Sequence, residues 1–241
     1  MTRAYRRSVS NDEVELFARI YDMVKPDLKT MEAAMRETLA MVLISPQFLY
    51  HTESDSATDT HYAMASRLSY FLWASMPDGE LLDAAFKDNL HQPELLAKQV
   101  RRMVKDEKAD TLGDLFAAQW LGFGLLGNRI RLDPIDNPWC TDSLMKSIKM
   151  ETSLFFQSLI RDNRPLSELL TADYTFLNEE LANHYRIEGV KGKQMRRVKV
   201  NGVRGGIFGQ ASILAITSYP HQTSPVKRGT WILTDLLGTP P

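Results

Sequence analysis

The longest run of residues with helical spacing of apolar side chains reads SLMKSIKMETSLFFQSLIRD and extends from Ser143 to Asp162. Apolar residues recur along it every three or four positions, which is the period of an α-helix. Thr141 or Asp142 can cap its start, because a side-chain oxygen there accepts a hydrogen bond from a free backbone N–H. A run of about twenty residues gives a helix of roughly 30 Å. We therefore expect a helical fold in which this is the central helix.

Shorter helices are predicted along the rest of the chain. Ser10 to Glu13 reads SNDE, a capping-box pattern in which the two outer side chains satisfy free backbone N–H groups. The helix after it should reach about Lys25, and a second should begin near Thr30 and end before Pro46, which disfavours helix in the residue ahead of it. Further short helices are predicted in HYAMASRLSYFLWASM, through Phe86 with Asp78 as a possible cap, from Pro93, in TLGDLFAAQWLGF and RPLSELL, and in NEELANHY with Asn178 as its cap.

One segment has the pattern of a strand. MRRVKV alternates apolar and basic residues and leads into Asn201-Gly202, a dipeptide typical of tight hairpin turns. Strand is therefore expected only in the neighbourhood of Arg196 to Val203. The predicted fold class is mainly α, a compact multi-helix bundle with one short β-hairpin near the C-terminal third.

Composition excludes several classes of protein. The net charge is −1, so no overall field attracts nucleic acid or an anionic membrane. Cys140 is the only cysteine, which excludes an internal disulfide, a CxxC zinc or redox pair, and a CxxCH site for covalent haem. The histidines stand apart in the sequence, so no structural metal is predicted. The apolar stretches are too short for a membrane span, and Met1 is followed by polar TRAYRR rather than a signal-peptide core.

Single side chains with chemical potential also have ordinary interpretations. Glu180 and His184 are spaced for one helix face and could offer two metal ligands, but a surface pair is favoured. Glu151 on the central helix could act as an acid or base if buried, but we expect it to face solvent or pair with a cation. Arg67 and Trp73 could border a ligand-binding site, but we favour core packing of this helix with the Arg67 guanidinium exposed.

Two neighbouring segments near the C-terminus are the best candidates for binding. VRGGIFGQAS, from Val203 to Ser212, lacks the spacing of a phosphate-binding loop, so its glycines indicate a sharp turn, with Arg204 available to an anion or acidic partner. TSYPHQTSPVKRG follows an apolar run, and Pro225 suits a first helical turn with Ser224 as N-cap. The candidate binding residues are Arg204, His221, Ser224 and Arg228, which we expect to face one cleft. The alternative is that the loop only fixes the path between two packed helices.

A succession of blocks carries a resemblance to a known family. The blocks are RAYRR, LISPQFLY, SRLSYFLWASMPD, FAAQWLG, METSLFF, DYTFLNEELANHY and RGGIFGQASILAITSYPHQTSPVKRGTWILTDLLGTPP. In this order they resemble the planctomycete cytochrome-associated proteins, large secreted chains built of domains of unknown function. The resemblance covers nearly the whole chain. It implies an amino-terminal helical segment at 1–52, a central helical domain at 61–190, and the start of a third, truncated domain at 195–241.

The resemblance also implies a setting. In that family a cytochrome c-like domain with a CxxCH motif usually lies upstream, so the chain is expected to be an internal fragment. It should carry no cofactor itself, with haem c only on the upstream domain. The expected partner is that cytochrome c-like domain or another redox partner, and the expected location of the parent protein is the periplasm or cell surface.

Three functions remain open at this point. The first is a non-haem module that supports electron transfer or redox chemistry by docking onto a cytochrome or presenting substrate to it. The second is a non-catalytic scaffold for protein interactions. The third is a hydrolase that uses His221 or Glu151, although no GxSxG elbow is present, so the sequence leaves open whether the chain is an enzyme.

Overall fold

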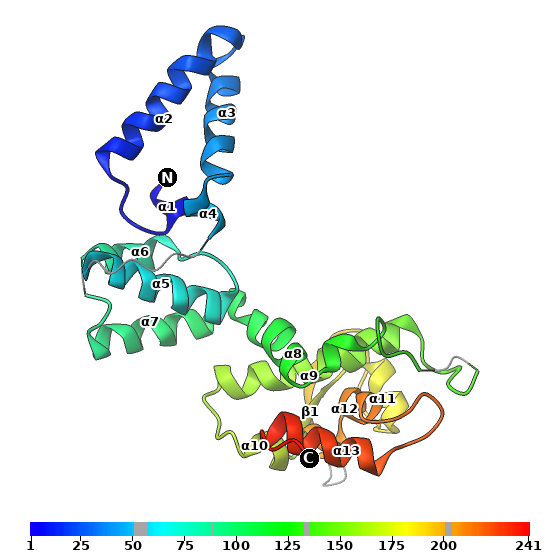
Figure 1. Ribbon diagram of the computed structural model, residues 1–241. Coiled ribbons are helices and arrows are strands. Elements are labelled where there is room, and N and C mark those ends of the chain that lie inside the picture. The colour runs from blue at the N-terminus through cyan, green and yellow to red at the C-terminus, as the bar shows by residue number, and fades with distance from the viewer. Residues whose placement is uncertain (51–56, 88, 133–134, 201–203) are drawn as a thin grey trace. The chain divides into compact units, whose positions relative to one another are not determined.

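The computed structural model describes residues 1–50, 57–87, 89–132, 135–200 and 204–241. The chain is mainly helical, as predicted, and divides into two compact units, Met1–Met103 and Val104–Pro241 (Figure 1). This division by contacts falls at another place than the three-part division expected from the sequence, which stays a prediction about family domains. In the described residues, no helix is both long and apolar enough to cross a membrane.

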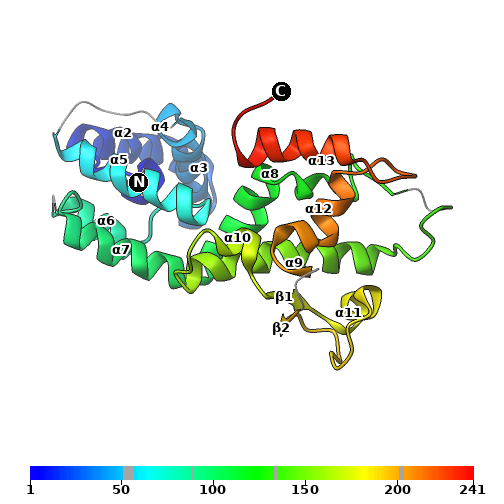
Figure 2. The same cartoon turned by 90° about the horizontal axis from the view of Figure 1, so that it is seen from below.

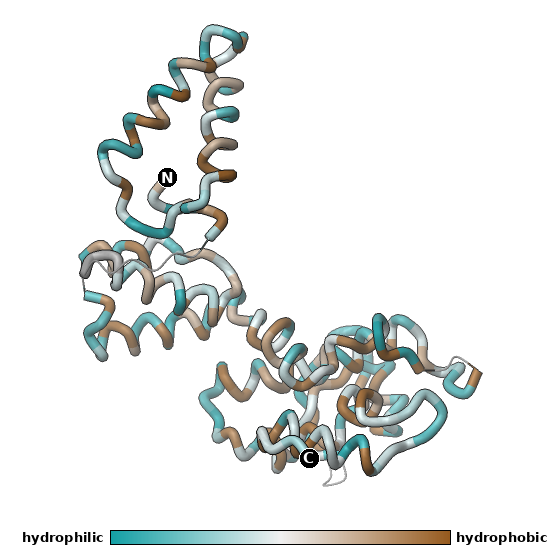
Figure 3. The backbone as a smooth tube through the Cα atoms, in the orientation of Figure 1, coloured by the Kyte–Doolittle hydropathy of each residue, from teal (hydrophilic) through white to brown (hydrophobic). Residues whose placement is uncertain are grey.

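The first unit begins with a helical hairpin. Its elements are α1 (Thr2–Tyr5), α2 (Asn11–Val24), η1 (Lys25–Asp27), α3 (Met31–Leu43) and α4 (Pro46–Leu49). The predicted capping box at the start of α2 is confirmed, because Ser10 accepts from the Glu13 N–H and the Glu13 carboxylate accepts from the Ser10 N–H. Apolar and polar residues are interspersed along α2 (Figure 3), yet α2 has no fully buried residue.

The rest of this unit packs around Trp73. It consists of α5 (Ala57–Trp73), α6 (Gly79–Phe86) and α7 (Pro93–Lys105). Trp73 is buried and its Nε1–H donates to the Met103 carbonyl at 2.9 Å, while Arg67 is exposed, so the core interpretation of this pair is confirmed. Arg102 lies over the Trp73 ring and donates to both oxygens of Asp78, the N-cap of α6.

The second unit is built on α9 (Asp142–Arg161), the long helix predicted above. Thr141 caps it, and ten of its residues are buried. The other elements are η2 (Glu107–Asp110), the π-helix η3 (Leu112–Ala117), α8 (Ala118–Trp120), η4 (Phe123–Leu125), α10 (Glu168–Thr171), β1 (Tyr174–Leu177), α11 (Glu179–Tyr185), β2 (Arg196–Lys199), η6 (Ile207–Gly209), α12 (Ala211–Ile216), α13 (Pro225–Trp231) and the π-helix η7 (Ile232–Leu236).

Several elements pack directly on α9, including η3, β1, α11 and α12. η3 lies so close to α9 that position 113 requires glycine. A Cβ on Gly113 would lie 2.6 Å from the Ser153 carbonyl oxygen. On another side of the unit, α13 and η7 lie beside α8 (Figure 2), where Trp231 donates to the Leu121 carbonyl and Trp120 to the Asp235 carbonyl.

The sheet has the predicted strand but a different partner. β2 pairs antiparallel with β1, in a register that places Tyr174 opposite Lys199 and Leu177 opposite Arg196. The expectation that strand is confined to 196–203 is therefore wrong, and the expected turn at Asn201-Gly202 lies outside the described residues. β1 was missed because it is almost wholly buried, so its sequence YTFL lacks the alternation of a half-exposed strand.

Candidate functional site

The loop before α13 leads into the capped helix start that the sequence predicts. Ser224 is the N-cap of α13 and accepts from the Lys227 N–H at 3.2 Å, and Pro225 is the first helical residue. Ser218 and Thr223 form an isolated antiparallel bridge across the loop. The Lys227 Nζ donates to the Ser218 carbonyl at 2.6 Å. The polar residues of this segment therefore fix its path.

His221 and Arg228 have different partners in this loop. The His221 Nδ1 lies 2.5 Å from the Asp136 carboxylate, and both side chains are largely exposed. The Arg228 Nε–H donates to the Thr217 hydroxyl at 3.2 Å. Thr217 is buried, so Arg228 ties the start of α13 to the end of α12.

Arg204 lies with another group of residues. Its Nη1–H donates to the Gly209 carbonyl at 3.0 Å, and its guanidinium stands 4.2 Å from the centre of the Tyr185 ring. A cleft that Arg204 shares with the loop stays a prediction. Arg204 instead contacts Tyr185, which belongs to a cluster of polar side chains from α9, β1 and α11. The sequence patterns did not predict this cluster.

The centre of this cluster is Glu151, whose side chain is only 1% exposed. The Thr175 hydroxyl donates to its Oε1 at 2.7 Å, and the Tyr185 hydroxyl donates to its Oε2 at 2.5 Å. Burial raises the pKa of the Glu151 carboxyl from 4.5 to about 7, while the hydrogen bonds from Thr175 and Tyr185 and the charge of Arg204 oppose that rise. The interpretation of Glu151 as a solvent-facing residue is therefore wrong, whereas the charge of the nearby Arg204 does act on its carboxyl.

The helical register of α9 held the signal for this burial. Ile148, Thr152, Phe155 and Leu159 are all buried, and Glu151 falls on the same helix face as these residues. A carboxylate on the buried face of a helix is enclosed with its apolar neighbours, although a carboxylate is more stable in water. The residue type of Glu151 and its two apolar neighbours do not indicate burial, whereas its position on the buried face of α9 does.

Tyr185 connects this carboxyl to the start of α12. Its hydroxyl accepts from the Ala211 N–H at 2.8 Å while it donates to Glu151. Burial, and next the neighbouring Glu151, hold the pKa of the Tyr185 phenol well above its usual range. The backbone of α12, the phenol of α11 and the carboxylate of α9 thus form one continuous hydrogen-bonded chain.

The glycine turn places Arg204 and α12 against this chain. Gly206 has φ 60°, and a Cβ there would lie 2.3 Å from the Leu170 carbonyl oxygen. A Cβ on Gly209 would lie 2.7 Å from the Arg204 backbone. The prediction of a sharp turn with close backbone approach is confirmed at Gly206.

More polar groups lie beside the cluster. The hydroxyls of Thr152 and Ser212 share a short hydrogen bond, and both side chains are fully buried. Gln210 is also fully buried, and neither its Oε1 nor its Nε2 has a hydrogen-bond partner among the described residues. This interior is therefore unusually polar for a helical core, although Glu151 itself is closed to solvent.

The histidine and carboxylate on α11 that could offer two metal ligands have other partners. Glu180 accepts from the hydroxyls of Thr141 and Ser143, whereas His184 stacks on Trp139 with ring centres 4.5 Å apart. Within the described ranges, no three residues among His, Cys, Asp and Glu are placed to hold a metal ion. Two histidines that are distant in sequence do meet, because the rings of His61 and His91 lie 4.5 Å apart.

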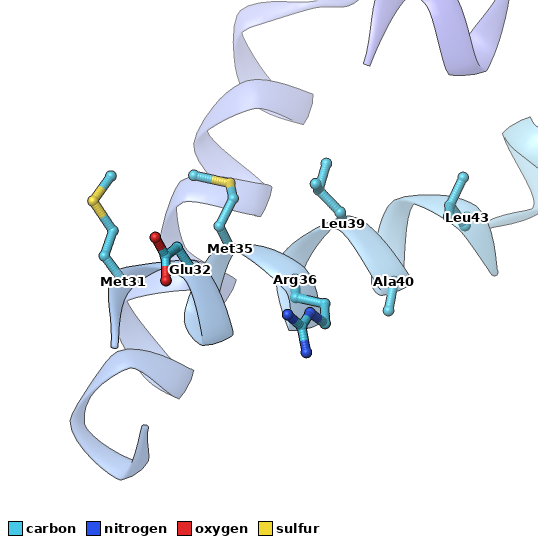
Figure 4. A pocket seen from close by; sticks show the side chains of 7 residues that line it. All are labelled: Met31, Glu32, Met35, Arg36, Leu39, Ala40 and Leu43. Atoms are coloured by element: carbon cyan, nitrogen blue, oxygen red, sulfur yellow. The ribbon is translucent and has the colours of Figure 1, made fainter. Parts of the chain in front are cut away.

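The first unit carries an apolar groove on α3. Its volume is about 550 Å³, and the residues that line it are Met31, Glu32, Met35, Arg36, Leu39, Ala40 and Leu43. The four large apolar side chains are spaced four residues apart and project from one side of the helix (Figure 4). We call them the α3 stripe. Met31 is 68% exposed and Leu39 is 50% exposed, so the described residues of this unit leave much of the stripe open to solvent.

Comparison with known proteins gives three adjoining family matches. Residues 60–187 match the family PSD4, described as a protein of unknown function (DUF1592). Residues 1–53 match PSD5 (DUF1595) and residues 204–241 match PSCyt3 (DUF1588), both described in the same words. No curated protein and no solved structure matches the chain. Because the PSD4 match alone covers more than half of the residues, the chain belongs to this family of planctomycete cytochrome-associated domains.

Proposed function

We propose that the chain is a non-haem helical docking module of a cytochrome-linked protein of the cell envelope. In this role it supports electron transfer or redox chemistry by binding a cytochrome c-like domain, either of the same polypeptide or of a redox partner. The observation that carries the proposal is the α3 stripe, an exposed row of large apolar side chains on a two-helix hairpin.

The chemistry of the stripe suits protein binding. Met31 and Met35 are unbranched, so their side chains can adapt to the shape of a partner surface. Leu39 and Leu43 are branched and less flexible, and they form the other end of the stripe. Covering the exposed half of one such side chain contributes about 1 kcal/mol. Glu32 and Arg36 border the row, and charged residues at the edge of an apolar centre are typical of protein interfaces.

The family supports a cytochrome as the partner, because its domains occur with cytochromes. With Cys140 as its one cysteine, the chain has no CxxCH motif, so covalent haem must come from elsewhere. The alternative is a non-catalytic scaffold that binds a protein without haem through the same stripe. A hydrolase is favoured less, because the carboxyl of Glu151 is closed to solvent.

Binding to an isolated c-type cytochrome domain from the same family tests this function. The chain is immobilised, and haem absorbance reports how much cytochrome domain is retained. We expect Leu39→Glu to weaken binding several-fold, because it places a charge inside the apolar contact. Leu166→Glu is the matched control, since Leu166 is 69% exposed and lies in the other compact unit.

Both variants should keep the circular dichroism of the unchanged protein. Docking on a cytochrome is refuted if the haem domain is not retained, or if Leu39→Glu retains as much as Leu166→Glu. Retention of a haem-free domain of the same family, with the same sensitivity to Leu39→Glu, would favour the scaffold.

A further inference from the structure

Tyr185 has the surroundings of a phenol that can lose an electron and a proton together. Its ring is buried, and its hydroxyl donates to the Glu151 carboxylate across 2.5 Å. When the Glu151 carboxyl is ionised, above its pKa of about 7, the proton can therefore cross one short hydrogen bond to a base that is already in place. The Ala211 N–H donates to the same phenolic oxygen at 2.8 Å and holds it in position when the proton leaves.

A path of aromatic rings leads from this phenol to the surface. Trp139 is 45% exposed, and its ring stacks on His184 with centres 4.5 Å apart and an angle of 27°. The rings of His184 and Tyr185 follow at 5.7 Å. Burial, and then the charge of Arg204, lower the pKa of His184, which favours the neutral imidazole. The path thus contains no fixed positive charge on a ring.

We propose that Tyr185 is a redox-active tyrosine, oxidised by one electron through His184 and Trp139 while Glu151 takes its proton. The oxidant is a high-potential one-electron metal centre that meets Trp139 at the surface. The O–H bond of Tyr185 breaks, its proton forms an O–H bond with Oε2 of Glu151, and its electron reduces the metal centre. The products are a neutral tyrosyl radical and a neutral carboxylic acid, and reduction of the radical returns the proton.

Arg204 sets the energy of this step. Before oxidation the carboxylate of Glu151 balances the guanidinium, which stands 4.2 Å from the Tyr185 ring centre. After oxidation the site has lost one negative charge, and the half-buried cation remains beside the buried Tyr185 ring, where charges interact more strongly than in water. Arg204 therefore raises the potential of Tyr185, so that only a strong oxidant reaches it. This activity goes beyond docking and can be tested without a cytochrome.

A second buried tyrosine serves as the matched control. Tyr174 is 5% exposed, and its hydroxyl donates to Glu168 at 3.3 Å. The Glu168 carboxylate is partly exposed and pairs with Arg164, and the Arg197 guanidinium lies 3.6 Å from the Tyr174 ring centre. The longer hydrogen bond and the two cations make Tyr174 harder to oxidise.

Flash oxidation of the whole chain tests the proposal. Ruthenium tris-bipyridyl is excited in the presence of persulfate, and electron paramagnetic resonance records the tyrosyl radical. We expect a signal that Tyr185→Phe loses and Tyr174→Phe keeps. Glu151→Gln should reduce the yield several-fold, because an amide does not accept the proton. Trp139→Phe should slow radical formation several-fold.

Each variant is first shown to be folded by circular dichroism and thermal melting. The proposal is overturned if Tyr185→Phe leaves the spectrum unchanged, which would assign the signal to other tyrosines. Should Tyr185→Phe fail to fold, Trp139→Phe and Glu151→Gln decide. Trp139 is a surface side chain and Gln matches Glu in shape, so an unchanged yield and rate in both folded variants also overturns it.

Discussion

Replacing Glu151 by glutamine is expected to remove a pH dependence from the stability of the protein. In the folded chain the carboxyl is enclosed, and among the described residues it accepts hydrogen bonds from the hydroxyls of Thr175 and Tyr185 alone. A glutamine in the same place still accepts one of these hydrogen bonds and donates to the other oxygen. The substitution therefore removes the ionisation and keeps the shape.

The magnitude follows from the pKa. Burial raises the pKa of Glu151 from 4.5 to about 7, so the folded state holds a proton that the unfolded state has released between these pH values. The contribution of Glu151 to the free energy of unfolding then falls as pH rises from 4.5 to 7, and it no longer changes well above pH 7. At about 1.4 kcal/mol per pKa unit, the full difference is about 3 kcal/mol. Most of it, about 2 kcal/mol or more, lies between roughly pH 5 and pH 8.

Urea unfolding at a series of pH values measures this difference. The free energy of unfolding of the unchanged protein should fall relative to that of Glu151→Gln as pH rises through this window. Glu179→Gln is the control. The Gly192 N–H, and next Lys191, lower the pKa of the exposed Glu179, so its contribution changes only in more acid solution. Parallel curves for the unchanged protein and Glu151→Gln would refute the assignment of a buried titrating carboxyl.

Two further predictions concern backbone geometry. Gly206→Ala should lower the free energy of unfolding by about 1–3 kcal/mol or more, because φ is 60° and the new Cβ would lie 2.3 Å from the Leu170 carbonyl oxygen; an unchanged melting temperature would contradict this. Ser224→Ala should cost about 1 kcal/mol by removing the N-cap of α13, whereas Ser224→Thr should keep most of it. Urea unfolding of both variants decides, and equal losses would contradict the role of the cap.

Local signals predicted the helices well, because a cap involves residues that are only three positions apart. Each predicted cap accepts the expected backbone N–H, and the residues concerned are Ser10, Asp78, Thr141, Asn178 and Ser224. The long helix was predicted for a similar reason, since its apolar period repeats over several turns. These interactions are contained in short windows of sequence, where spacing alone specifies them.

The buried cluster could not be predicted in the same way. Glu151, Thr175, Tyr185 and Arg204 come from separate elements, and nothing in a local window indicates that they meet. Arg204 illustrates the difficulty. Two glycines after it predicted a sharp turn correctly, but the direction of the guanidinium depends on where α11 packs, and the sequence does not show this.

The cluster also joins two segments that the family models separate. Glu151 and Tyr185 belong to the segment at 60–187, whereas Arg204 and Ala211 belong to the segment at 204–241. The Ala211 N–H binds the Tyr185 hydroxyl, and the Gly206 N–H binds the Ala172 carbonyl at 3.0 Å. Residues after 204 thus help to enclose Glu151, and burial is the main cause of its raised pKa. The packing of the second segment against α9 therefore contributes to the raised pKa of Glu151.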